Sequence, residues 1–199
     1  DMADIRAEFV RRSVADLSEQ LASREIALRI LVVDRFADVP DAIAGLAREH
    51  GCEQVHANAE YEVNEVRRDE ATGDRLAADG RGLQLHHDQC ILPPGTVRTG
   101  GGGFYSVFTP FKRNVLAQLR TDGLPEVQSA VRRQSAMLGR PDPVPEAVPG
   151  FPAPPAALAS LWPAGAAEAR RRLERFTAAR ITGYADTRDL AAEDATSRL

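Results

Sequence analysis

Two adjacent polar residues, Asn64 and Glu65, combine an amide with a carboxylate. They open a predicted helix at residues 62–78, directly after a predicted strand at residues 54–57. Ligands of α/β folds bind where strand ends and helix N-termini converge. An amide that donates and accepts, beside a carboxylate that accepts, matches the edge of a heterocycle such as a pterin. A solvated helix start is the alternative interpretation, because acidic residues there stabilise the helix dipole.

The last residues of the sequence, Thr196, Ser197, Arg198 and Leu199, are a second candidate site. Hydroxyl groups, backbone amides and an arginine are the groups that hold a phosphate. A segment this short also occurs by chance, so alone it is a weak signal.

Three other patterns favour structure over chemistry. The glycines at residues 100–103 lack the Gly-Lys-Ser/Thr ending of a P-loop, and we predict a surface loop there. His86 and His87 alternate across a predicted strand and cannot easily share a metal, so we predict no metal site. Four aromatic residues are predicted to be core rather than a stacking platform: Phe104, Tyr105, Phe108 and Phe111.

Helices and strands alternate along the first part of the chain. The expected helices are residues 4–22, 40–50, 62–78, 110–120 and 165–181, and the expected strands are 26–33, 54–57 and 83–86. This order predicts the α/β class, with a Rossmann-like, mostly parallel sheet flanked by helices. Residues 26–33 are apolar and rich in β-branched side chains, which is typical of a buried strand. Nine of the 13 prolines lie between Pro125 and Pro163, so we predict an extended connector there.

The composition of the 199 residues, with 43% hydrophobic and 27% charged side chains, is that of a globular protein. No apolar run approaches the length of a membrane helix. Two cysteines give no disulfide framework, and we expect a cytoplasmic protein. The net charge of −4 excludes a uniformly basic protein that coats nucleic acid, although the predicted helix at 165–181 has five arginines against two glutamates.

Taken together and in this order, the segments resemble the DNA photolyase/cryptochrome family, most closely the class I cyclobutane pyrimidine dimer photolyases. The residues that carry the resemblance are 58–69, 91–95, 99–100, 105–112, 184–189 and 196–199. The resemblance implies an α/β antenna domain at residues 1–122, without its first strand, and a connector at 123–163. It further implies that residues 164–199 begin an all-α FAD-binding domain.

The resemblance also implies roles for individual residues. Asn64 and Glu65 match contacts to an antenna chromophore, methenyltetrahydrofolate or, alternatively, a deazaflavin. Arg188 matches a residue that touches DNA. Contacts to FAD are implied for Tyr184, Thr196, Ser197, Arg198 and Leu199.

The implied activity is light-driven repair of cyclobutane pyrimidine dimers in UV-damaged DNA by electron transfer from reduced FAD. The alternative is a cryptochrome-like blue-light photoreceptor without repair activity. The segment at residues 184–199 disfavours a third class, a stand-alone nucleotide-binding α/β module. We expect the chain to be a fragment of a longer, monomeric flavoprotein lyase, to contain no catalytic residue, and to be inactive alone.

Overall fold

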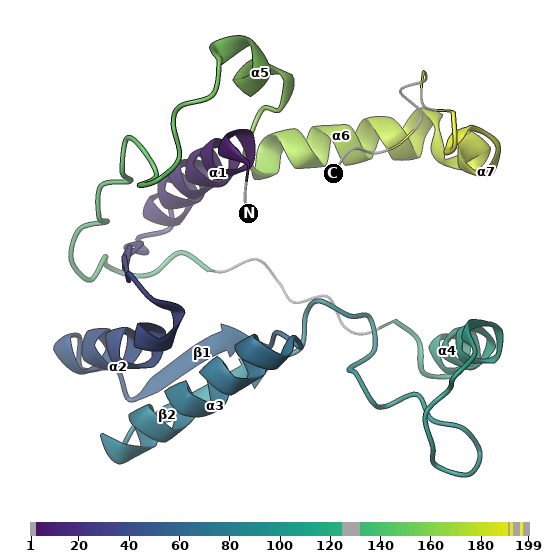
Figure 1. Ribbon diagram of the computed structural model, residues 1–199, viewed down its shortest axis with the longest axis horizontal. Coiled ribbons are helices and arrows are strands. Elements are labelled where there is room, and N and C mark those ends of the chain that lie inside the picture. The colour runs from purple at the N-terminus through teal and green to yellow at the C-terminus, as the bar shows by residue number, and fades with distance from the viewer. Residues whose placement is uncertain (1–2, 125–131, 191, 193–195, 197–199) are drawn as a thin grey trace. The chain divides into compact units, whose positions relative to one another are not determined.

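The computed structural model describes residues 3–124, 132–190, 192 and 196 (Figure 1). The chain divides into two compact units. Unit 1 comprises Asp1–Ile30 and Ala130–Leu199, and unit 2 comprises Leu31–Ser129. The division into an antenna domain, a connector and a helical domain remains a prediction.

Unit 2 is built around a parallel pair of strands, β1 (Gln54–Asn58) and β2 (Gly82–His86). Helix α3 (Val63–Ala78) is the crossover between them, as a parallel pair requires. Helix α2 (Val39–Glu49) precedes β1, after a short 3₁₀ turn, η1 (Phe36–Asp38), and packs against α3. The prediction of an α/β fold with a parallel sheet flanked by helices is confirmed.

The core of unit 2 lies between these helices and one face of the sheet. Ala44 and Leu76 are fully buried, and Val55 and Leu83 pack against them. The strands alternate, so the side chains of the other sheet face are exposed and polar: Gln54, His56, Asn58, Gln84 and His86. Among the described residues of unit 2, the helices therefore cover only one side of the sheet.

The predicted strand at residues 26–33 is wrong, because this segment is extended but belongs to no sheet in the described chain. Its polar groups bond instead to the proline-rich segment: the Asp142 amide donates to the Leu28 carbonyl at 2.9 Å. The Asp142 carboxylate accepts from the Ile30 amide and from the Arg29 guanidinium, both at 2.9 Å. Because these contacts use the Leu28 carbonyl and the Ile30 amide, those backbone groups cannot pair with a neighbouring strand.

Helix α4 (Phe108–Asp122) follows the glycine-rich loop, close to its predicted place. The prediction that four aromatic residues here are core is wrong for Phe104 and Phe108, which are each 71% exposed, and for Phe111, which is 37% exposed. No other helix or strand of the described chain packs extensively against α4. The rings contact one another instead, with Tyr105 and Phe108 centred 6.1 and 6.5 Å from Phe111.

Unit 1 is helical. Helix α1 (Asp4–Ala22) has its predicted bounds and packs against two helices of the second half of the chain, α5 (Ala156–Leu161) and α6 (Ala166–Ala179). A 3₁₀ turn, η2 (Ile181–Gly183), leads into the short helix α7 (Tyr184–Thr187). Residues 132–155 form no helix or strand, as predicted, whereas α5 was not predicted. Alanines and leucines after a proline pair explain α5, because they favour a helix and Pro155 fits its start.

Helix α6 begins on a polar contact with α1. The Asp16 carboxylate accepts a hydrogen bond from the Ala166 amide at 3.0 Å, which satisfies one of the free donors of the first turn. Gly165, which precedes the helix, has a φ of +105°, and a Cβ there would lie 2.8 Å from the Asp16 carboxylate carbon. A side chain at residue 165 would therefore disrupt this junction. None of the described helices has the length and apolar character needed to cross a membrane.

Candidate functional site

The first candidate site is the N-terminus of α3, in unit 2. Asn64 and Glu65 are the second and third residues of this helix, after Glu62 in the N-cap position. The Asn64 side chain is exposed and that of Glu65 is half-buried. Within the described residues, neither side chain has a hydrogen-bond or ion-pair partner. Both therefore keep their hydrogen-bonding groups available beside the free backbone amides of a helix start.

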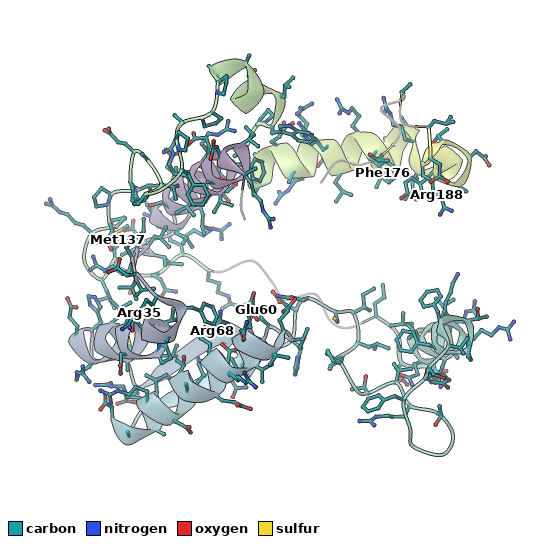
Figure 2. The ribbon with its side chains drawn as sticks, in the orientation of Figure 1. Arg35, Glu60, Arg68, Met137, Phe176 and Arg188 are labelled. Atoms are coloured by element: carbon teal, nitrogen blue, oxygen red, sulfur yellow. The ribbon has the colours of Figure 1, made fainter. Side chains whose placement is uncertain are left out.

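Three charged residues near this site are joined by hydrogen bonds around Arg68. The Arg68 guanidinium donates to Glu60 at 2.8 Å and to Asp69 at 2.7 Å, and it lies 5.6 Å from the centre of the Phe36 ring (Figure 2). Burial acts to lower the pKa of Arg68, but the hydrogen bonds and charges of Asp69 and Glu60 outweigh it and raise the pKa. Arg68 thus links the loop after β1 to α3 through Glu60, and this contact holds the loop in place beside Asn64 and Glu65.

Two stacked ring pairs lie where the strands end. The rings of His56 and His86 are 5.2 Å apart, with 2.9 Å between His56 Nδ1 and His86 Nε2. The Tyr61 and His87 rings are 5.8 Å apart, with 2.9 Å between the hydroxyl and Nδ1. Burial raises the pKa of Tyr61, with smaller contributions from Cys90 and Asp88. The two consecutive histidines thus have separate partners, and the described residues hold no group of three metal-binding side chains.

These two ring pairs were not predicted from the sequence. In the register of the parallel pair, His56 lies opposite Gln84, two residues before His86. Both histidines therefore point to the same sheet face. The one signal in the sequence is a histidine near the end of each predicted strand, which does not by itself give the register.

The second candidate site lies in unit 1, around α7. Tyr184 is the first residue of α7, is 41% exposed, and packs edge-on against Phe176 with ring centres 5.7 Å apart (Figure 2). Arg188 is the first residue after α7, and its amide donates to the Tyr184 carbonyl at 3.0 Å. The Arg188 side chain is 56% exposed and lies 3.5 Å from the Asp189 carboxylate.

The structure thus brings Asn64 next to Glu65 in one unit, and Tyr184 next to Arg188 in the other. Thr196 is exposed. The remaining residues of the predicted phosphate-binding segment, Ser197, Arg198 and Leu199, lie outside the described residues. The predicted roles of all these residues remain predictions.

The family model and the related sequences that match this chain point to the same family. The family model described as DNA photolyase matches residues 1–130. A deoxyribodipyrimidine photo-lyase from Vibrio cholerae is 32% identical over 206 aligned positions, which cover 100% of this chain and 42% of the relative. The protein of the same name from Escherichia coli is 31% identical, over 100% of this chain and 41% of its own length. The chain thus spans about two fifths of the length of these relatives.

Solved structures agree on the fold. A class III photolyase from Agrobacterium tumefaciens superposes with a TM-score of 0.72 at 24% identity, over 98% of this chain and 40% of that one. A cryptochrome from Synechocystis superposes with a TM-score of 0.61 at 16% identity, over 94% of this chain and 38% of that one. At these identities the likeness shows the fold alone.

Proposed function

Because the chain belongs to the DNA photolyase family, we propose that it forms part of a deoxyribodipyrimidine photo-lyase. The observation that carries the proposal is the alignment, since relatives with this name match the chain over its whole length. The activity is light-driven repair of cyclobutane pyrimidine dimers in DNA. The residues described here contribute to cofactor and DNA binding, and none of them is assigned a catalytic role.

We assign Asn64 and Glu65 to the antenna chromophore. Their amide and carboxylate, which have no partner among the described residues, lie at the start of α3 and suit a ring system with both donor and acceptor atoms, such as the pterin of methenyltetrahydrofolate. A deazaflavin is the alternative pigment. Arg68 supports the site indirectly, because it fixes the preceding loop through Glu60.

We assign Tyr184 and the segment from Thr196 to Leu199 to FAD. Tyr184 fits this role, because Phe176 holds its ring edge-on while 41% of the residue stays accessible. Hydroxyl, amide and guanidinium groups of the terminal segment suit the phosphates of the cofactor. When bound, reduced FAD supplies the electron that opens the dimer.

We assign Arg188 to DNA. Its one ion pair with a described residue joins it to a carboxylate that is itself 86% exposed, is 3.5 Å long and contributes little in water. Arg188 can therefore exchange Asp189 for a DNA phosphate at low cost, and the release of counterions favours that exchange.

Photoreactivation of a defined substrate tests the proposal. The full-length protein is mixed with an oligonucleotide that contains one thymine dimer, under near-ultraviolet or blue light and in the dark. We expect loss of the dimer in the light only. A protein that binds flavin but leaves the dimer intact would instead support the cryptochrome-like alternative.

A further inference from the structure

A cavity of about 350 Å³ lies within unit 1, between α1, the turn before α6, and α6 itself. Phe9, Trp162 and Pro163 form much of its apolar wall, and Arg6, Glu168 and Arg172 are its charged residues. This volume is within the range of pockets that hold small organic ligands, which are typically lined by apolar side chains with a few polar groups. The predicted cofactor and DNA contacts do not include any of these residues, so the cavity is a separate feature.

The aromatic side of the cavity is held in place by contacts within the unit. The Trp162 carbonyl accepts a hydrogen bond from the Arg12 guanidinium of α1 at 3.0 Å. The Arg172 guanidinium lies 5.8 Å from the centre of the Trp162 ring, in cation–π range. Phe9 and Trp162 nevertheless remain 38% and 42% exposed, so their apolar surface is only partly used.

The charges around the cavity leave an excess of positive charge. Glu168 accepts hydrogen bonds from Arg171 at 2.8 Å and from Arg172 at 2.7 Å, so this one carboxylate faces two guanidinium groups. The exposed Arg6 has no side-chain hydrogen bond or ion pair with any described residue. A cation at the mouth of an apolar pocket is the feature that selects an anion over a neutral ligand of the same shape.

We propose that this cavity binds a small aromatic carboxylate, with its ring against Phe9 and Trp162 and its carboxylate on Arg6. The ring covers apolar surface that is otherwise exposed, and the carboxylate supplies a partner that Arg6 lacks among the described residues. Glu168 does not oppose the ligand, because Arg171 and Arg172 neutralise its charge. This inference does not depend on the proposed photolyase activity.

Calorimetric titration of the intact protein tests the inference with two probes of similar shape, 2-naphthoate and neutral 2-naphthalenemethanol. We expect 2-naphthoate to bind about tenfold more tightly. Arg6→Gln should remove this preference and leave binding of the alcohol unchanged, whereas Arg6→Lys should retain most of it. Arg120→Gln is the matched control, because Arg120 is exposed on α4 in the other unit and also has no partner among the described residues.

A crystal structure with 4-iodobenzoate locates the probe directly, since the iodine gives an anomalous signal. We expect that signal between Phe9 and Trp162. The proposal is overturned by equal affinity for the two probes, by the absence of binding at millimolar concentration, or by iodine bound elsewhere only. It is also overturned if side chains of the intact protein fill the cavity. These outcomes leave the photolyase proposal untouched, because repair is measured separately.

Discussion

Asn64 and Glu65 have no side-chain partner within the described chain, whereas the nearby Glu60 and Arg68 bind each other. We expect the double substitution Asn64→Ala and Glu65→Ala to remove the near-ultraviolet absorption of bound folate from the full-length protein. Flavin-driven repair should remain. The reason is that the substitutions remove ligand contacts without breaking any bond that holds α3.

The matched control is Glu70→Ala, since Glu70 is an exposed acidic residue of the same helix without a partner in the described chain. It should leave the absorption band unchanged. A double variant with normal pigment content would refute the assignment of Asn64 and Glu65. A deazaflavin spectrum would leave the fold intact but remove the basis for their roles.

Arg188 is the residue on which the DNA assignment can be tested alone. We expect Arg188→Ala to weaken binding of dimer-containing DNA and to reduce the slope of log K against log salt by about one phosphate contact. Arg113→Ala, at an exposed position of α4 in unit 2, should change neither quantity. Equal affinity and an equal slope for Arg188→Ala would reject the role.

Among the helices of unit 2, α3 carries the fully buried Leu76, which packs with Ala44 and Ala47 of α2. Leu76→Ala leaves a cavity in this small core, and we expect it to lower the free energy of unfolding by about 2–5 kcal/mol. Leu116→Ala is the control, because Leu116 on α4 is 40% exposed and its truncation should cost much less. Denaturant unfolding followed by circular dichroism measures both. Equal losses for the two variants would contradict the described core.

In helix α6 of unit 1, the Glu168 carboxylate accepts hydrogen bonds from two guanidinium groups. Hydrogen bonds from Arg171 and Arg172 lower the pKa of Glu168 from its ordinary 4.5 to about 2. A depressed pKa in the folded state means that this contribution is present above pH 4.5 and is lost as the pH falls toward 2. We expect Glu168→Gln to lower stability at neutral pH and to flatten the fall in stability between these values. If the free energy of unfolding fell equally with pH in the variant and the unchanged protein, protonation of Glu168 would not contribute to the loss of stability.

At the scale of whole elements, the periodic segments were predictable and the tertiary partners were not. The apolar stripe that predicts α1 and the glycine that ends α2 act locally, and both helices have nearly their predicted bounds. The apolar segment at residues 26–33 has the composition of a strand, but a strand also needs a neighbour. Here Asp142, more than 100 residues away, takes up hydrogen bonds from Arg29 and Ile30. Such a long-range contact has no signal in the local sequence.

At the scale of the molecule, the family was predictable because the motifs occur in order along the chain, and the family model matches residues 1–130. The position of Asn64 and Glu65 after a strand was equally predictable, because strand and helix patterns are local. The stacked pairs His56–His86 and Tyr61–His87 were not, since they depend on the register of two strands. Register follows from packing rather than from the residue types in either strand.

The 199-residue chain can be tested for activity without further sequence. It spans about two fifths of the length of its photo-lyase relatives, and its predicted FAD contacts are Tyr184 and the segment from Thr196 to Leu199. So few contacts do not offset the freedom that a large cofactor loses on binding. We therefore expect the purified chain to be colourless and to leave dimer-containing DNA unrepaired in near-ultraviolet or blue light. The full-length protein, prepared in parallel, should contain flavin and repair the same substrate. Flavin bound one-to-one by the chain, or light-dependent repair by it, would mean that these 199 residues contain far more of the active site than the residues assigned above.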